Sequence, residues 1–281
     1  MALATVVDYS KYQGTVSRTS HRAMREAGVA GVVVGLWHGL DINPYALSCL
    51  ANAKAEQLLR GGYVVVNNRS GREAVLAGKQ AAGGHWPDLF GVAIDVEIKG
   101  VTEAIMADAF DEVLRQGQRP FLYTGNWFWN WWALELGHFP DASAFAAWIA
   151  YYNGVADLAS VPPRPGYGPI IGHQYAGSTA AFGTTVDFNV FDTAWLAGSQ
   201  EEDDMMTDQQ IAEAIGRIAR AGQLGLDKGI VGTEKLLDLI GDLKSEIAAL
   251  KARVAAVEAA PPAAGVTEER VKEIVRELVA E

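Results

Sequence analysis

Residues 90–100 read FGVAIDVEIKG, and they place two acidic side chains, Asp95 and Glu97, inside an otherwise apolar run. The apolar residues are typical of a buried β-strand, in which an unpaired carboxylate is costly. Because side chains alternate between the two faces of a strand, Asp95 and Glu97 share one face and the apolar residues between them share the other. The apolar face can pack beneath helices, so we expect the acidic face to point into the interior of a barrel.

Seven further stretches have the apolar composition of strands, and helical patterns follow several of the early ones. This order is typical of an irregular (β/α) TIM-like barrel, and an open doubly wound sheet is the alternative. No glycine-rich phosphate loop follows the first strand, which weighs against the nucleotide-binding form of that sheet. The predicted strands are 4–10, 29–37, 63–67, 90–98, 120–124, 145–152, 169–175 and 185–191, and the predicted helices include 45–60, 70–82 and 102–116.

The composition of the chain changes near residue 199. All Trp, Tyr and Phe residues precede this point, and an α-helical region rich in Ala, Glu, Leu and Lys follows it. The junction GSQEEDDM is polar and acidic, as expected of a linker. We therefore predict a catalytic barrel (1–198), an acidic linker (199–206), a helical region (207–259), and a Pro/Ala linker with a short amphipathic helix (260–281).

A heptad pattern runs through the helical region at 236–257. Branched residues at the a positions and mostly Leu at the d positions favour a parallel two-stranded coiled coil, so a homo-oligomer is predicted. A single amphipathic helix that packs on its own domain is the alternative. The seam consists of Leu236, Ile240, Leu243, Ile247, Leu250, Val254 and Val257.

Charge and hydropathy exclude several classes of partner. The net charge of −11 argues against nucleic acid, because phosphate binding requires a basic surface. No run of about 18 apolar residues occurs, so no membrane insertion is expected. The single cysteine, Cys49, rules out an internal disulfide framework and is expected in the core.

Two other predicted strands carry an acid after an apolar run, Asp8 in VVDYS and Asp187 in TVDFN. If the first and last strands are neighbours where the barrel closes, these acids lie close to each other and can share a pocket with Asp95 and Glu97. Crowded carboxylates cannot all ionise easily, so at least one pKa should rise. A carboxyl that keeps its proton near neutral pH is what general-acid cleavage of a glycosidic bond requires.

These four acids are the predicted catalytic residues. Glu97 has the longer side chain and is the predicted proton donor, whereas Asp95 is predicted to stay charged and to stabilise an oxocarbenium-like transition state. Structural hydrogen bonds or salt bridges are the alternative for each acid, and a calcium or magnesium site is the alternative for the cluster. The chain lacks a glycine-turned calcium loop and zinc-ligand spacing of its histidines, so no metal or cofactor is predicted.

Aromatic residues gather in YTGNWFWNWW (123–132) and WIAYY (148–152). Their rings can stack on the C–H faces of sugars, whereas core packing is the alternative and is expected to account for most of residues 127–132. Tyr123, Trp148 and Tyr152 lie at strand ends near the acids, and they are the predicted substrate-binding rings.

Five segments, taken in order, resemble motifs of the GH25 family of lysozymes, the Chalaropsis-type muramidases. The segments are VVDYSKYQG, AIDVE, PFLYTGNWFW, AWIAYY and HQYAG followed by VDFNVF, and they cover residues 5–192. The chain departs from the family at YVVVNNRSG, where a Tyr-His-aromatic motif is common, and at His173, which replaces the Trp of Trp-Gln-Tyr. Gln174, the next residue of that motif, is expected to bind substrate.

The resemblance implies hydrolysis of the β-1,4 bond between N-acetylmuramic acid and N-acetylglucosamine in the glycan strands of peptidoglycan. Glu97 matches the family's proposed acid, the three aspartates match its other active-site acids, and participation of the substrate's N-acetyl group has been suggested for the family. The features fit a phage endolysin or virion-associated lysin, made in the host cytoplasm without a signal peptide and acting at the cell wall after release or on a virion. The alternatives are a non-catalytic carbohydrate-binding or structural virion protein on the same barrel, and a glycosidase for another polysaccharide.

Overall fold

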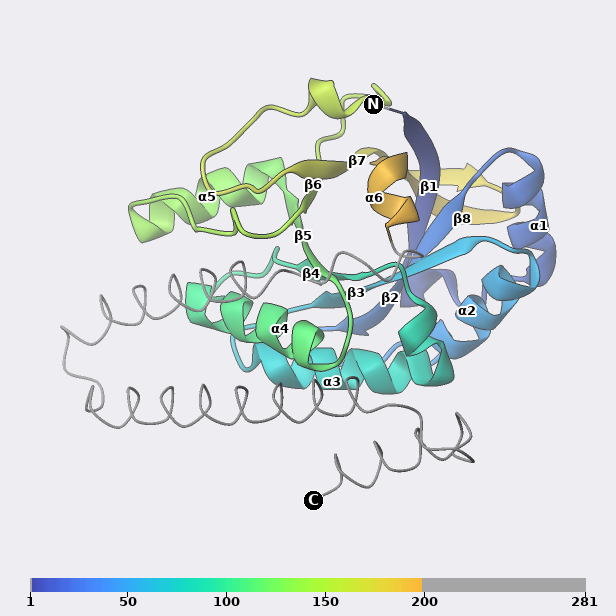
Figure 1. Cartoon of the computed structure of the whole chain (residues 1–281), viewed down its shortest axis with the longest axis horizontal. Helices are drawn as coiled ribbons and strands as arrows, with labels where there is room; N and C mark the ends of the chain where they lie inside the picture. The colour runs from blue at the N-terminus through green and yellow to red at the C-terminus, as the bar shows by residue number, and fades with distance from the viewer. Residues whose placement is uncertain (1, 199–281) are drawn as a thin grey trace, which may run out of the picture. The chain divides into compact units, whose positions relative to one another are not determined.

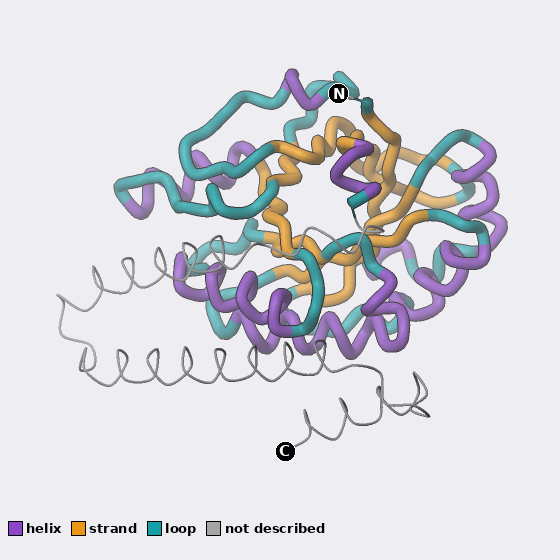
Figure 2. Tube along the Cα trace, in the orientation of Figure 1, coloured by secondary structure: helices purple, strands orange, loops and turns teal. Residues whose placement is uncertain are grey.

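The computed structural model describes residues 2–198; the predicted linkers, coiled coil and C-terminal helix (199–281) lie outside the described residues. In the described part, eight strands form one closed barrel in the order β1 to β8 (Figure 1, Figure 2). Neighbouring strands from β1 to β7 run parallel, whereas β8 runs antiparallel to both β7 and β1. The predicted irregular barrel is confirmed, and the open sheet is excluded.

The elements follow the predicted alternation, and Cys49 is buried in α2 as expected. None of the helices between residues 2 and 198 has the length and apolar character needed to cross a bilayer. The strands are β1 (Leu3–Tyr9), β2 (Gly31–His38), β3 (Leu59–Val65), β4 (Val92–Asp95), β5 (Pro120–Gly125), β6 (Ala147–Ala150), β7 (Ile170–Ala181) and β8 (Thr184–Asp192). The α-helices are α1 (Arg18–Glu26), α2 (Ala46–Ala55), α3 (Gly71–Ala82), α4 (Glu103–Arg115), α5 (Asn126–Leu136) and α6 (Thr193–Ala197), and the 3-10 turns are η1 (Lys11–Gln13), η2 (Gly83–Asp88) and η3 (Leu158–Ser160).

Three strand boundaries differ from the prediction by three residues or more, and the largest difference is the end of β7 at Ala181, where the prediction ends at residue 175. β3 begins at Leu59, whereas the predicted strand begins at residue 63. The sequence LRGGYVV contains two glycines, which weigh against a strand, and the predicted strand therefore begins after them. A Cβ atom on Gly61 would lie 2.5 Å from the ring of Phe90, so this glycine makes room for a ring inside the barrel. β4 ends at Asp95, which places Glu97 in the loop beyond the strand.

The helical cover of the barrel is uneven. Helices α1 to α4 lie around one flank, outside the first strands (Figure 1). Between β6 and β7 the described chain has a loop with only the turn η3, and β7 and β8 then form an antiparallel hairpin. Phe182 and Gly183 make its two-residue turn with φ angles of 53° and 74°, as a tight hairpin requires.

Aromatic rings fill the barrel at the end where its parallel strands begin. The ring of Phe121 lies 6.4 Å from Phe191 and 4.9 Å from Trp195 of α6, measured between centroids. Arg119 fixes α6 in this position, because its guanidinium lies 3.8 Å from the centroid of the Trp195 ring and donates a hydrogen bond of 2.7 Å to the Trp195 carbonyl. This end is an apolar core, so polar chemistry is confined to the other end.

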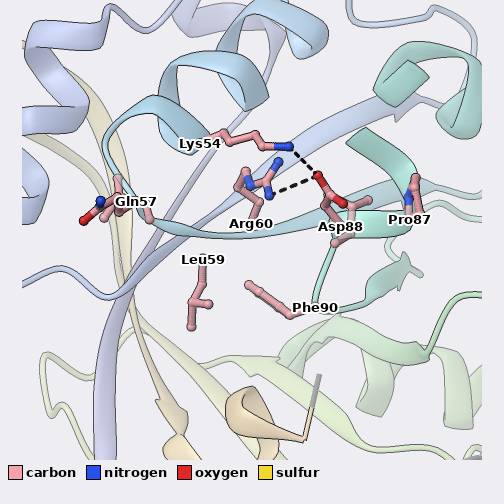
Figure 3. Close-up of a pocket in the computed structure, with 9 residues that line it drawn as sticks. Lys54, Gln57, Leu59, Arg60, Pro87, Asp88 and Phe90 are labelled. Carbon is pink, nitrogen blue, oxygen red and sulfur yellow. Dashed lines mark hydrogen bonds and ion pairs between the residues drawn. The ribbon is translucent and has the colours of Figure 1, made fainter. Parts of the chain in front are cut away.

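A hollow of about 620 Å³ opens beside this apolar end (Figure 3). It is lined by Leu59, the first residue of β3, and by Phe90, which lies two residues before β4. Its two cations are already paired, because Asp88 accepts from Lys54 at 2.9 Å and from Arg60 at 3.4 Å. The hollow lies at the opposite end of the strands from the predicted catalytic acids.

Truncating Phe121, one of the rings that fill the apolar end of the barrel, tests the importance of these rings for the fold. We expect Phe121→Ala to lower the free energy of unfolding by about 3–5 kcal/mol, because it leaves a cavity among rings that cannot fully collapse. Urea denaturation measures this loss. Leu134→Ala on α5, where the side chain is 84% exposed, is the control and should change stability by less than about 0.5 kcal/mol. A loss below about 1 kcal/mol in Phe121→Ala would contradict the prediction.

Candidate active site

The four predicted acids lie at the end of the barrel where the parallel strands terminate. Asp8 of β1 pairs directly with Asp187 of β8, as predicted for neighbours at the barrel closure. Asp95 is the last residue of β4, and Glu97 follows it in the loop. Asp8 and Asp95 are buried, whereas Glu97 and Asp187 are partly exposed. The cluster therefore has a buried base and a more accessible rim.

Two side-chain amides hold Asp8. Nε2 of Gln174 and Nδ2 of Asn189 each donate a hydrogen bond of 2.8 Å to its Oδ1 atom. The indole Nε1 of Trp148 donates to Oδ1 of Asn189 at 2.8 Å. Because an indole nitrogen can only donate, Trp148 fixes the Asn189 amide with its NH2 group toward Asp8.

Gln174 connects this carboxyl to two phenols. Its Oε1 accepts hydrogen bonds from Tyr123 at 2.9 Å and from Tyr152 at 2.8 Å. Its Nε2 also donates to Oδ2 of Asp187 at 3.4 Å. Gln174 was predicted to bind substrate, but the structure buries it and gives it protein partners for both ends of its amide.

The other two acids lack such donors. Oδ1 of Asp95 and Oε1 of Glu97 are buried and have no hydrogen-bond partner among the described residues. Burial raises the pKa of Asp95 well above its ordinary value, and the charges of Glu97 and Asp8 raise it further. Burial also raises the pKa of Glu97 to about 7. Asp95 therefore favours its protonated form, and Glu97 is mostly protonated only below about pH 7.

The pKa values of Asp8 and Asp187 are raised by burial and lowered by hydrogen bonds at the same time. Burial and the charge of Asp187 raise the pKa of Asp8, while its hydrogen bonds from Asn189 and Gln174 oppose the rise. Burial raises the pKa of Asp187, and a hydrogen bond from the backbone N–H of Ser178 opposes it. Neighbouring charges therefore add to the rise in the pKa values of Asp8 and Asp95, whereas burial alone raises those of Asp187 and Glu97.

Asp95 is predicted to act in its charged form, and its surroundings in the free site differ from those of Asp8. A carboxylate is stabilised by N–H donors. Asp8 accepts from two side-chain amides, whereas the buried Oδ1 atom of Asp95 has no hydrogen-bond partner in the described chain. Burial then favours the neutral form of Asp95. The sequence pattern showed that both acids face inward but did not show which of them meets the amides.

The three predicted substrate-binding rings differ in exposure. Tyr152 is 54% exposed and keeps an open face, whereas Tyr123 is buried beneath it and Trp148 is only 1% exposed. The ring of Trp148 is therefore closed to a sugar in this structure, and its indole holds Asn189 instead.

Three residues of the site were not predicted. Asn189 lies two positions after Asp187 on the same strand, a spacing that could have identified it. Tyr63 of β3 is buried near the acids, whose charges add to burial in raising its pKa. Trp127, in the first turn of α5, is 50% exposed, and its ring centroid lies 5.4 Å from that of Tyr152. A helical pattern alone does not show which ring faces the barrel mouth.

His173, one of the departures from the family pattern, is fully buried. Its ring nitrogens lie 2.8 Å from the carbonyl oxygen of Tyr151 and 3.0 Å from that of Asp157. It therefore holds the loop between β6 and β7. Within residues 2–198, no three His, Cys, Asp or Glu side chains are grouped as ligands of a metal ion would be.

Comparisons with known proteins agree with this geometry. The family model described as glycosyl hydrolases family 25 matches residues 7–184. No curated protein sequence matches the chain.

Three solved structures are similar in fold. The CTP1L endolysin has a TM-score of 0.57 at 17% identity, covering 72% of this chain and 71% of that one. The muramidase from Acremonium alcalophilum has a TM-score of 0.53 at 19% identity, covering 70% and 98%. The lysozyme from Streptomyces coelicolor has a TM-score of 0.54 at 20% identity, covering 69% and 95%.

Removing the ionisable group of Asp95 should stabilise the fold. Because the pKa of Asp95 is raised in the folded state, its contribution to stability is fully present below its unfolded pKa and is lost as the pH rises. We expect Asp95→Asn to melt roughly 2–4 °C above the parent protein near pH 8, about 1 kcal/mol in a domain of this size, with the difference vanishing near pH 4. Calorimetry across this range measures it.

The matched control is Glu135→Gln on the exposed face of α5, which should show no pH-dependent difference. A lower melting temperature of Asp95→Asn near pH 8 would show that the charged form of Asp95 is stabilised, contrary to the prediction.

Proposed function

The chain belongs to glycosyl hydrolases family 25, and from that premise we propose that it hydrolyses the β-1,4 bond between N-acetylmuramic acid and N-acetylglucosamine in peptidoglycan. The observation that carries this proposal is the group of four acids at the barrel mouth, with an accessible carboxyl beside exposed aromatic rings. The similar structures are those of an endolysin, a muramidase and a lysozyme, which supports a cell-wall glycan as substrate.

Glu97 is the general acid in this proposal. It lies on the loop beyond β4, where a glycosidic oxygen can reach it, and burial holds its pKa at about 7. A carboxyl of this kind is protonated in a useful fraction of molecules near neutral pH and can transfer its proton to the leaving oxygen.

Asp95 then acts on the substrate through its free oxygen. The buried Oδ1 atom has no partner in the described chain, so an N–H group of the substrate can supply the missing hydrogen bond. The N-acetyl group of an amino sugar carries such an N–H. Accepting this bond would favour the charged form of Asp95 only once the substrate is bound.

Asp8 and Asp187 are the acids whose charged forms accept hydrogen bonds from the protein. The two amide donors oppose the rise that burial causes in the pKa of Asp8, and the backbone N–H of Ser178 opposes the rise in the pKa of Asp187. Negative charge beside the sugar ring stabilises an oxocarbenium-like transition state.

Replacing the proton donor tests the assignment. We expect Glu97→Gln to lower the release of muropeptides from purified cell walls by about 10²–10⁴-fold without changing the fold. In the parent protein, kcat/KM should fall as the pH rises through about 7, because Glu97 must carry a proton. Chromatography of released fragments measures both, and circular dichroism checks the fold.

Glu135→Gln is again the control and should keep full activity. Retained lysis by Glu97→Gln would refute the role of Glu97. Mass spectrometry of the fragments identifies the bond, because a muramidase leaves N-acetylmuramic acid at the new reducing end, whereas a hydrolase for another polysaccharide would leave the wall intact.

We also propose that residues 236–257 join two copies of the chain in parallel, as in a lysin that binds the wall multivalently. The support is the heptad seam in the sequence, with branched residues at a and mostly Leu at d. Two linked copies would gain affinity for a repetitive polymer without a dedicated binding module. An endolysin or a virion-associated lysin would both fit this arrangement.

Sedimentation of the full chain tests the self-association. We expect a dimer at tens of micromolar, and Ile247→Asp should give a monomer because it places a charge in the seam. A monomeric parent protein at that concentration would refute the proposal.

A further inference from the structure

Helix α5 buries most of its aromatic rings but directs one to the barrel mouth. Phe128, Trp129 and Trp132 pack in the core outside the barrel. Trp127, in the first turn, is half-exposed, and its neighbours are Gly125 and Tyr152. Its surroundings link it to the proposed acid.

Gly125, the last residue of β5, shows how closely Trp127 approaches Glu97. A Cβ atom on Gly125 would lie 2.4 Å from Cε2 and Cζ2 of Trp127 and 2.7 Å from Oε1 of Glu97. The backbone of Gly125 is extended, with φ −75° and ψ 134°, so other residues could adopt it. The glycine is needed for space, because the indole and the carboxyl oxygen pack against the same side of its Cα.

No side chain of the described chain donates to the covered oxygen of Glu97, although the backbone N–H of Gly125 lies close enough to the carboxyl to oppose the rise in its pKa. This oxygen, Oε1, is buried and has no hydrogen-bond partner among the described residues. The titratable groups that face Glu97 come from β1, β4, β5 and the segment after β6, and no cation of the described chain is among them. They are Asp8, Asp95, Tyr123 and Tyr152.

The indole of Trp127 also meets the ring of Tyr152. The two ring centroids lie 5.4 Å apart with an angle of 38° between the planes. The hydroxyl of Tyr152 donates to Gln174, which fixes the phenol and so limits the movement of Trp127. The indole therefore neighbours a fixed ring and shares the space beside Gly125 with the carboxyl of Glu97.

We propose that Trp127 is a positioning residue for the acid: its indole shields Oε1 of Glu97 from water and, with Tyr152, forms an aromatic wall beside that carboxyl. Ring carbons cannot solvate a carboxylate, so the charged form of Glu97 loses hydration while the neutral form loses little. Trp127 therefore keeps the proton on Glu97 until a glycosidic oxygen arrives. The mechanistic part of this inference rests on the proposed function.

A titration of Glu97 tests the shielding without any substrate. The full-length protein is labelled with ¹³C at the Glu side-chain carboxyls, and Glu97→Gln identifies the signal of Glu97. We expect Trp127→Ala to lower the proton affinity of Glu97 by about tenfold, because water then reaches Oε1. Trp127→Phe should keep most of the parent affinity, since a phenyl ring also excludes water.

Leu134→Ala on the same helix is the matched control and should leave the titration unchanged, since its side chain is exposed. In turnover assays, the fall of kcat/KM at high pH should move to lower pH in Trp127→Ala and return in Trp127→Phe. A merely structural role would lower activity at every pH without moving the profile.

An unchanged titration of Glu97 in Trp127→Ala overturns the inference, whether or not the protein cleaves peptidoglycan. A shift in Trp127→Ala that Trp127→Phe restores supports it. If that shift occurs but the parent protein releases no muropeptides, the shielding by Trp127 stands and the proposed function fails.

Discussion

The antiparallel pairing of β1 with β8 is the interaction on which the site depends. Its register sets Asp8 opposite Asp187 and Val6 opposite Asn189, so the interior face of β8 meets the interior face of β1. A slip of one residue would turn the side chains of β8 outward, because strand side chains alternate. The register that closes the barrel is therefore also the register that brings Asp187 beside Asp8.

The barrel interior divides into an apolar end and an acidic end, and the donors at the acidic end are distributed unevenly. Gln174 and Asn189 both serve Asp8, whereas Asp95 and Glu97 receive no side-chain donor in the described chain. This inequality gives different proton affinities to groups of the same chemistry. Acids with different tasks can then share one pocket.

Much of this arrangement could be predicted from the sequence. The alternation in AIDVE and the acids that follow apolar runs identified Asp8, Asp95, Glu97 and Asp187, because a closed barrel brings strand ends together. The aromatic residues could not be sorted in the same way. Exposure of a ring depends on where each element meets the barrel mouth, and this depends on tertiary packing that strand and helix periodicity do not contain. Trp148, predicted to bind substrate, is consequently buried in the core, whereas Trp127, in a segment expected mostly in the core, is half-exposed.

The crowded acids also link folding to proton exchange with the solvent. Burial raises the pKa values of all four carboxyls, so near neutral pH these groups together bind more protons in the folded chain than in the unfolded chain. Unfolding must release these protons to the buffer. The heat of unfolding therefore includes the heat of protonating the buffer. Calorimetric enthalpies measured in phosphate and in Tris will differ by an amount set by the protons that the four carboxyls release less those that His21, His38 and His85 take up, because burial lowers the pKa values of these histidines.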